Sequence, residues 1–466
     1  MAPARFLPVK PRLWSIPLLS LFALCCYMAL EPASSSSADT SAIVPADVAW
    51  MLTASALVLL MTPGLSFFYG GMVDKRNIVS TMLQSFVAMG IISILWVAVG
   101  FSLAFGDSIH GLIGNPFTYF MFRGVGDAPN AELAPTIPLA LFALFQLKFA
   151  IITPALITGA FAERVRFSSY MVFICLFSLF IYCPLAHWTW HPHGFLREMG
   201  VLDFAGGTVV HMAGGLAALA GALFLGPRHA HKNQDAQSPA HIPYVLLGTG
   251  MLWFGWFGFN AGSALSASPL AVRAFLTTNT ASASAMLTWI FIEGYRGRRP
   301  SALGACIGAV VGLVAVTPAA GFVTVGASAL IGAIASSVSH LAAHWRMKSR
   351  LDDTLDVFPC HGVGGMVGMI LTAVFADKVG LIYGQSATFV SHLWALFAVA
   401  GFTFVGSYIL YVIAHAIIPM RVSETEELIG LDLSQHGEGV GDLVSSGIAG
   451  VQPMHPMHAK RVAANV

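Results

Sequence analysis

Two ionisable side chains, Asp203 and His211, stand in an otherwise apolar stretch of the chain. On one helix they would lie about 12 Å apart along the axis and roughly 80° apart around it. Ionisable groups are costly inside lipid, so this pair indicates a functional site, unless a neighbouring helix satisfies the histidine in a purely structural role. The two residues alone do not decide between these interpretations.

A second histidine, His361, lies in another apolar stretch and is followed by Gly362, Gly364 and Gly365, which leave room beside the ring. Two imidazoles that share one proton would fix each other's tautomer, and burial would keep at least one of them neutral. Such a pair could hydrogen-bond a small polar guest or relay a proton. The alternative is two unrelated core histidines.

Aromatic residues accompany the histidines. Phe145 and Phe149 are spaced to share one helix face, Trp190 falls in a predicted outer loop, and an aromatic-rich stretch ends at Ser263. Single aromatics are more often core or interface residues. Together with a hydroxyl, these side chains could bind a small cation through their ring faces and an accepted N–H bond.

The elements that must position these residues are membrane spans. The chain is 56% hydrophobic and 10% charged, with mean hydropathy +0.76, whereas soluble domains carry about 25% charged residues. A net charge of +1 gives no basic surface for nucleic acid. The six cysteines include no C-x-x-C pair, so they predict neither a disulfide framework nor a zinc site.

Apolar runs predict an all-α polytopic membrane protein with eleven transmembrane helices. Most Lys and Arg residues outside the leader fall in alternate loops. Loops rich in Lys and Arg lie on the cytoplasmic side, so this pattern predicts that the N-terminus is outside and the C-terminus inside. Eleven spans permit two inverted five-helix repeats plus one extra helix, with a substrate path at their interface. His211 and His361 would then occupy the fifth and tenth spans. The predicted spans are 46–70, 78–105, 136–160, 168–188, 203–225, 243–263, 278–295, 301–317, 322–342, 358–376 and 390–418.

Three regions follow from this pattern. Residues 1–38, with a basic start, an apolar centre and then small residues, are typical of a signal peptide; a retained first helix is the alternative. Residues 46–420 form the transmembrane domain. Residues 421–466 form a cytoplasmic C-terminal tail.

Five ordered motifs resemble those of the ammonium transporter family, bacterial type. They are MTPGLSFFYGG at 61–71, GAFAERVRF at 159–167, DFAGGTVVH at 203–211, GWFGFNAGS at 255–263 and DVFPCHG at 356–362. The resemblance covers about residues 47–439. It implies a transporter of ammonium and ammonia for nitrogen uptake, with methylammonium as a further substrate, and neither an enzyme nor a cofactor or metal protein.

The resemblance assigns the outer part of the pathway. Trp190, Ser263 and Phe149 would recruit ammonium, with Phe145 lining the same entrance. Phe149 and Phe259 would stack as the gate below that site.

The resemblance also assigns the inner part. His211 and His361 would be twin histidines in the pore, Trp256 would line it, and Asp203 would support the outer site from behind. The family further implies a homotrimer in the inner (cytoplasmic) membrane. By the same resemblance, residues 421–466 would serve as a regulatory segment that docks a PII-type signalling protein.

A physical mechanism accompanies these assignments. A bare ammonium ion pays a large desolvation cost in an apolar pore, whereas neutral ammonia crosses easily. The cation should therefore bind outside and lose its proton near the gate. We expect the proton to follow a separate relay through His211 and Asp203. The alternatives are a passive Rhesus-type ammonia channel, an ammonium sensor, and a metal-dependent membrane enzyme, for which only the pair His340 and His344 offers a suitable spacing.

Two features depart from the family pattern. Lys148 precedes the expected gate residue Phe149 by one position, and we expect it to lie on a neighbouring helix face, about 100° away. His191 and His193 make the loop after Trp190 bulkier than usual. With His187 they raise the idea of a metal site, although their spacing matches no strong ligand pattern.

Overall fold

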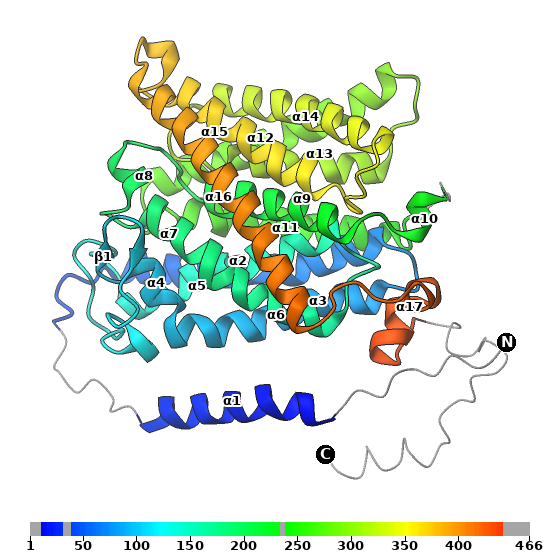
Figure 1. Cartoon of the computed structure of the whole chain (residues 1–466). Coiled ribbons are helices and arrows are strands. Elements are labelled where there is room, and N and C mark those ends of the chain that lie inside the picture. Colours follow the sequence, from blue (N-terminus) through cyan, green and yellow to red (C-terminus); the bar gives the residue numbers. More distant parts are fainter. Residues whose placement is uncertain (1–10, 31–38, 234–237, 441–466) are drawn as a thin grey trace.

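Long apolar helices make up most of the chain in the computed structural model, which describes residues 11–30, 39–233 and 238–440 (Figure 1). Among these residues, nine helices are long and apolar enough to cross a membrane. The apolar α13 (Ala302–Val316) is shorter, and α12 (Pro269–Tyr295) is long but falls outside the nine. These two coincide with the eighth and seventh predicted spans. The prediction of an all-helical membrane protein is confirmed.

The remaining elements have the following bounds. Up to residue 233 they are α1 (Pro11–Leu30), α2 (Pro45–Met72), α3 (Ile78–Leu95), η1 (Trp96–Gly100), α4 (Phe101–Phe105), β1 (Ser108–Ile109), β2 (Ile113–Gly114), η2 (Phe120–Phe122), α5 (Leu139–Ile157), η3 (Thr158–Ala160), α6 (Phe167–Phe177), η4 (Ser178–Tyr182), α7 (Cys183–Trp190), α8 (Phe195–Glu198), η5 (Gly207–Met212), α9 (Ala213–Leu225) and α10 (His229–Lys232). From residue 238 they are α11 (Ile242–Gly262), α14 (Val325–Lys348), η6 (Phe358–Val363), α15 (Gly364–Phe375), η7 (Leu381–Tyr383), α16 (Ala387–Ile417), α17 (Glu424–Ile429) and η8 (Asp432–His436), in addition to α12 and α13. Strands β1 and β2 pair antiparallel, with Ser108 opposite Gly114 and Ile109 opposite Ile113.

Most predicted spans begin and end within a few residues of an observed helix, but three differ. The ninth was expected to end at residue 342, whereas α14 continues to Lys348. The seventh was expected from residue 278, whereas α12 already begins at Pro269, a residue suited to the first turn of a helix. The fifth was expected from residue 203, whereas the helix begins at Gly207. Asp203 therefore lies before the helix rather than on it, and the helical spacing to His211 that we expected is wrong.

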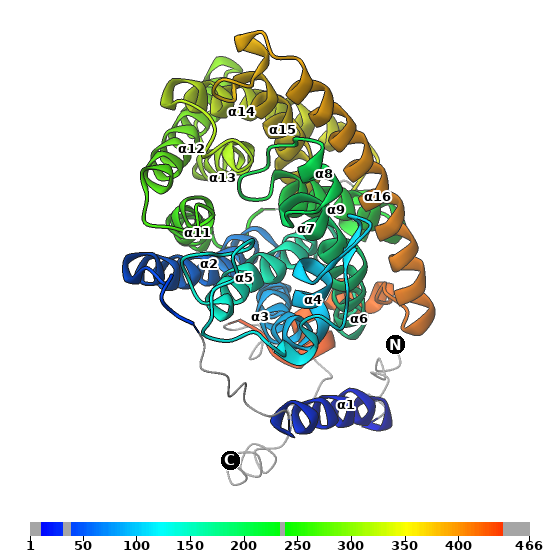
Figure 2. The same cartoon turned by 90° about the vertical axis from the view of Figure 1, so that its left-hand side faces the viewer.

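The helices form two groups that α16 borders on one flank (Figure 2). One group contains α2 to α9, and the other contains α11 to α15. Helices α2 and α11 join the groups through a tight contact, because glycines remove the side chains between them. A Cβ on Gly248 would collide with the backbone of Phe68, and one on Gly258 would come within 2.6 Å of Leu57.

Different segments cover the two ends of the bundle. The β1 hairpin and α8 lie at one end, and α10 and α17 lie at the other (Figure 1). Helix α17 begins with a capping box between Ser423 and Glu426. Beyond it, Asp432 accepts hydrogen bonds from the backbone N–H groups of Val79 and Ser80 at the start of α3. The tail up to residue 440 is thus attached to the bundle, and its expected remainder, 441–466, lies outside the described residues.

A buried ion cluster ties three loops together at the α10 end of the bundle. Arg228 donates from Nε to Asp352 at 2.8 Å and from Nη1 to Glu163 at 2.6 Å. Arg164 donates to the backbone oxygen of Asp352 at 2.6 Å. Burial by itself would raise the pKa of Asp352, but the hydrogen bonds from Arg228 and the nearby Arg164 charge hold it below its usual value. The tail joins this region where the His229 N–H donates to Glu427.

Helix α1 stands apart from this packing. Most of its apolar side chains are exposed, and Tyr27 accepts a hydrogen bond from Arg123 at 2.9 Å. The expected end of the signal peptide near residue 38 lies outside the described residues.

Candidate functional site

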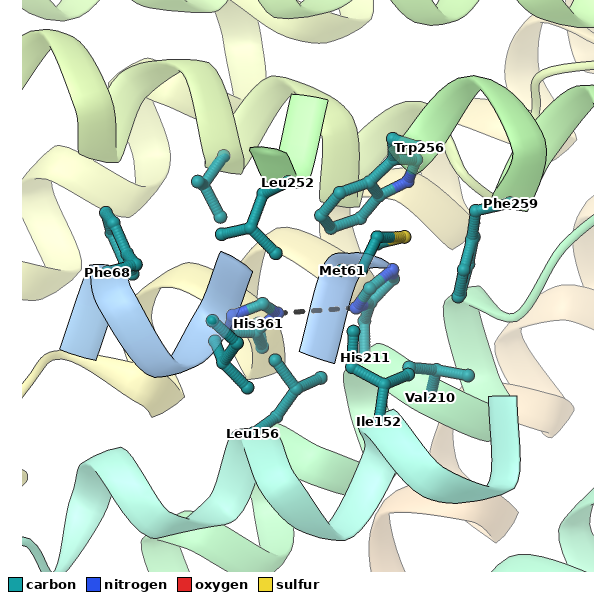
Figure 3. A pocket seen from close by; sticks show the side chains of 12 residues that line it. Met61, Phe68, Ile152, Leu156, Val210, His211, Leu252, Trp256, Phe259 and His361 are labelled. Atoms are coloured by element: carbon teal, nitrogen blue, oxygen red, sulfur yellow. Dashed lines mark hydrogen bonds between the residues drawn. The ribbon is translucent and has the colours of Figure 1, made fainter. Parts of the chain in front are cut away.

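Two buried histidines face each other at the centre of the bundle (Figure 3). His211 lies in the π-helical turn η5 and His361 in the π-helical turn η6, and these turns lead into α9 and α15. Their Nδ1 atoms are 3.3 Å apart, and the rings are inclined by 26°. Single π-helical turns occur often at functional sites. The prediction that the two histidines form a pair agrees with this geometry.

Glycines allow the two histidine-bearing turns to approach. A Cβ on Gly215 would collide with the backbone of Gly362, so only glycine lets α9 lie against η6 here. A Cβ on Gly365 would come within 3.1 Å of the Cβ of His211. The glycines after His361 were expected to leave room beside its own ring, whereas Gly365 makes room for His211 on the facing span.

The short contact between the two Nδ1 atoms restricts the protonation of the pair. One ring must donate its Nδ1–H and the other must accept, because two Nδ1–H groups would repel each other and two lone pairs would make no bond. If both rings are neutral, the donor ring has a lone pair on Nε2 and the acceptor ring has an N–H there. Nε2 of His211 has no hydrogen-bond partner among the described residues. The pair can therefore offer a hydrogen bond to a small guest.

A narrow cavity runs past the histidines. Its volume is about 10 Å³, which is about the room that one water-sized molecule needs. Apart from the histidines, only apolar and aromatic side chains line it. These are Met61, Leu65, Phe68, Ile152, Leu156, Val210, Leu252, Trp256, Phe259 and Val310. A small neutral molecule fits such a space, whereas a hydrated ion does not.

Trp256 lies against His211, as the resemblance implied for a pore residue. The two rings are stacked with their centroids 5.3 Å apart. The indole Nε1–H donates to Oγ1 of Thr317 at 2.9 Å, and that hydroxyl donates to the backbone oxygen of Leu313 at 2.8 Å. Thr317, at the end of α13, thus holds the ring that covers one side of the histidine. Nothing in the sequence singled it out.

The aromatic residues expected at the outer end lie together. The ring centroids of Phe149 and Phe259 are 4.2 Å apart and the rings are tilted by 31° rather than stacked, with Phe259 forming one end of the cavity (Figure 3). Phe149 also contacts Phe145 at 4.9 Å and Trp190 at 5.5 Å. The chain therefore brings these four rings, from α5, α7 and α11, together at the end of the cavity that Phe259 forms.

Ser263 lies one helical turn beyond Phe259, at the end of α11. Its hydroxyl donates to the Phe259 backbone oxygen at 2.9 Å, so the lone pairs of the hydroxyl remain to accept a hydrogen bond. The preceding residue, Gly262, allows Phe145 to pack closely, because a Cβ there would be 2.8 Å from that ring. A hydroxyl acceptor thus lies beside the aromatic group.

Asp203 caps the helix that carries His211. One carboxylate oxygen accepts from the N–H groups of Gly206 and Gly207, each at 2.7 Å, and the other accepts from Thr208 N at 2.7 Å and its hydroxyl at 2.5 Å. The backbone oxygen of Asp203 accepts the indole N–H of Trp190 at 3.3 Å. Asp203 therefore fixes both the start of η5 and the orientation of Trp190.

Lys148 does not line the cavity. It is buried, and no hydrogen bond or ion pair of its ammonium group occurs within the described part of the chain. One turn earlier on the same helix face, Leu144 is exposed at the surface of the subunit. This placement agrees with the expected position on a neighbouring helix face.

His191 and His193 line a hollow of about 570 Å³ at the end of the bundle that carries the β1 hairpin. The rings of His187 and His191 are stacked at 4.4 Å, and both nitrogens of His187 are engaged, by Ala104 O and Ser108 Oγ. His193 lies between two exposed carboxylates. Within residues 11–30, 39–233 and 238–440, no three His, Cys, Asp or Glu side chains are arranged to hold a metal ion.

The comparisons with known proteins agree with this site. The model of the Ammonium Transporter Family matches residues 49–440. A putative ammonium transporter of Methanothermobacter thermautotrophicus is 46% identical over 84% of this chain and 97% of its own length. The ammonium transporter of Aquifex aeolicus is 44% identical over 90% of this chain and 97% of its own length.

Solved structures show the same fold. Mep2 of Saccharomyces cerevisiae superposes with a TM-score of 0.79 at 34% identity, covering 84% of this chain and 90% of that one. A structure described as a sensor Amt protein superposes with a TM-score of 0.78 at 31% identity, covering 84% of this chain and 98% of that one. The chain belongs to the ammonium transporter family and is a membrane transporter of ammonium, not an enzyme.

Proposed function

We propose that the protein captures ammonium at an outer site, removes its proton, and conducts ammonia past the twin histidines. The observation that carries this proposal is the cavity of about 10 Å³, which holds two histidines and is closed by the ring of Phe259. Room for one small molecule and a lining without charged groups suit ammonia. They do not suit a cation that keeps its water shell.

Capture rests on the aromatic group and Ser263. Trp190, Phe145 and Phe149 offer ring faces, which attract a small cation by about 0.5–2 kcal/mol. The Ser263 hydroxyl, which already donates its hydrogen to Phe259, offers a lone pair to an ammonium N–H. Methylammonium carries the same charge and N–H groups, so it is a second expected substrate.

Passage requires the gate and the proton step. Phe149 and Phe259 must part to admit the guest, because Phe259 forms one end of the cavity and the Phe149 ring lies 4.2 Å from it. Ammonium loses its proton at this gate, and ammonia then forms a hydrogen bond with the free Nε2 of His211. The hydrogen bond between their Nδ1 atoms offers a route for the proton, which makes transport electrogenic.

Asp203 supports this machinery as a positioning residue. Its two oxygens accept four hydrogen bonds, which occupy the lone pairs of the carboxylate. This arrangement favours the histidine pair over Asp203 as the proton carrier, with Asp203 holding Trp190 and η5 in place.

The topology belongs to the same proposal. Eleven spans with the N-terminus outside and the C-terminus inside would form two inverted five-helix repeats plus α16. The equivalent placement of the two histidines, each in a π-helical turn before the α-helical part of its span, supports the repeat. The inner (cytoplasmic) membrane, the homotrimer and a PII-type partner at the α17 end rest on membership of the family. Residues 1–38 would act as a cleaved signal peptide, in keeping with the exposed α1.

Two alternatives share this fold. A passive Rhesus-type channel would conduct ammonia without charge movement, and the Trp190 and Ser263 site argues against it because a cation site suits ammonium capture. A sensor would bind ammonium through the same residues, and the likeness to a sensor Amt structure shows that the fold permits it. A measurement of ammonium transport and of the charge that moves with it distinguishes these functions.

The test is the current evoked by ammonium pulses in proteoliposomes on a solid-supported membrane. We expect a saturable current for the wild type, a strong loss for His211→Ala, and weakened saturation for Ser263→Leu. Ser337→Leu and His344→Ala serve as controls, because both residues lie on α14 away from the cavity and Ser337 makes the same intrahelical bond as Ser263. Equal currents in all five proteins would refute the site.

A further inference from the structure

Residues 199–203, the segment that leads into Asp203, are held by α16, the helix that falls outside the two proposed repeats. Ser391 Oγ donates to the backbone oxygen of Met199 at 2.8 Å. The next residue, His392, accepts the backbone N–H of Leu202 at Nε2, at 2.9 Å. Two consecutive side chains of α16 therefore grip a short stretch that has no regular structure of its own.

His392 uses both of its ring nitrogens. Because Nε2 accepts the Leu202 N–H, Nδ1 must carry the proton of the neutral ring, and it donates to the backbone oxygen of Met369 at 2.8 Å. The side chain is 1% exposed. His392 thus bridges the 199–203 segment to α15, the helix that continues from His361.

The segment that His392 holds leads directly to the capture site. Asp203 follows Leu202, accepts the Trp190 indole N–H on its backbone oxygen, and caps η5 with its carboxylate. Other anchors come from different elements: the Val201 N–H donates to Leu196 of α8, and the Phe204 N–H donates to Pro318 after α13. The anchor from α16 is the bond between His392 and Leu202, the residue directly before Asp203.

We propose that His392 is a positioning residue for ammonium capture, through which α16 sets the place of Asp203 and hence of the Trp190 ring. The inference rests on the proposed function, because it assumes that Trp190 binds the cation. Helix α16 runs along the flank of both helix groups (Figure 2). In this proposal it positions the capture site at the outer entrance. His392 itself touches no substrate.

The position of a cation-binding ring affects affinity more than the rate of passage through the pore. Loss of two buried hydrogen bonds should let the 199–203 segment shift, and about 1.4 kcal/mol of lost binding corresponds to about a tenfold weaker affinity. We therefore expect His392→Leu to raise the half-saturating ammonium concentration about tenfold while the maximal current stays within about twofold of the wild type.

Two variants make the test specific. His392→Gln can still accept with its oxygen and donate with its nitrogen, so it should restore the half-saturating concentration to within about threefold. Thr403→Val is the matched control, because Thr403 is buried on the same helix and its hydroxyl has no hydrogen-bond partner within the described ranges. It should behave as the wild type.

The assay is the ammonium-evoked current as a function of concentration, with size-exclusion profiles to verify folding. An unchanged half-saturation in folded His392→Leu, or a loss of maximal current without a shift in half-saturation, would overturn the inference. If that variant does not fold, His392→Asn replaces it. Its shorter amide reaches only one partner, so it should shift half-saturation more than Gln does, and equal values for Asn, Gln and wild type would overturn the inference.

The same experiment distinguishes a failure of the proposed function from a failure of the proposed role of His392. A Trp190→Leu variant should raise the half-saturating concentration if Trp190 binds the cation. No saturable wild-type current, or no effect of Trp190→Leu, would contradict the proposed function. A clear Trp190→Leu effect together with an inert His392→Leu would contradict only the role of His392.

Discussion

Replacing Asp203 by asparagine should destabilise the whole protein, not only stop transport. In the wild type each carboxylate oxygen accepts two hydrogen bonds at the start of η5. The asparagine oxygen can keep two of them, but its NH₂ group then faces the Thr208 N–H and hydroxyl, which lose their acceptor. With about 1.5–3 kcal/mol for each hydrogen bond to a charged group, the loss is about 3–6 kcal/mol.

The assay is thermal unfolding of the purified protein in detergent, with the ammonium-evoked current measured in parallel. Asp107→Asn is the control, because Asp107 is an exposed carboxylate with a single hydroxyl donor to its side chain, and the substitution should cost less than about 1.5 kcal/mol. A folded Asp203→Asn protein with wild-type thermal stability but no current would refute the positioning role. It would favour a direct part for this carboxylate in the proton path.

Three further predictions concern supporting residues. Thr317→Val should free the Trp256 indole and lower the current severalfold without loss of expression, as measured on the supported membrane. Asp352→Asn should lower the free energy of unfolding by about 3–5 kcal/mol, because it leaves two buried arginines, Arg164 and Arg228, with Glu163 as their remaining carboxylate partner. Burial, and then repulsion from a neighbouring carboxylate, raises the pKa of Asp353 from 3.8 to about 6. The stability that the protonated Asp353 carboxyl contributes is therefore fully present below about pH 3.8 and is lost as the pH rises through about 6. Asp353→Asn removes this titrating group and should flatten the fall in thermal stability over that range.

The spans and the identity of the histidine pair could be predicted because they depend on long-range composition and on residue types that lipid disfavours. Long apolar runs allow few structures in a membrane. His211 and His361 stood out because each was an ionisable group in such a run. Their contact at 3.3 Å could be expected from their corresponding places in the fifth and tenth spans, although the distance itself could not.

Other parts of the site carried no signal in the sequence. Val310 and Ile152 line the cavity, but an apolar residue in an apolar helix looks the same whether it faces a pore, a neighbouring helix or lipid. Thr317 and His392 form hydrogen bonds with residues far away in the chain, Thr317 with Trp256 and His392 with Leu202, so only the fold reveals them. The predicted start of the fifth helix was wrong, because hydropathy cannot show that the Asp203 carboxylate accepts the Gly207 N–H from outside the helix.

The most direct test of the mechanism is the number of charges moved per ammonium transported. Isotope-labelled methylammonium or ammonium uptake and the accompanying current can be measured on the same proteoliposomes. Deprotonation at the gate followed by separate passage of the proton predicts about one elementary charge per molecule, with both uptake and charge movement impaired in His211→Ala. Uptake by the wild type without charge movement would contradict the account and would favour a passive ammonia channel.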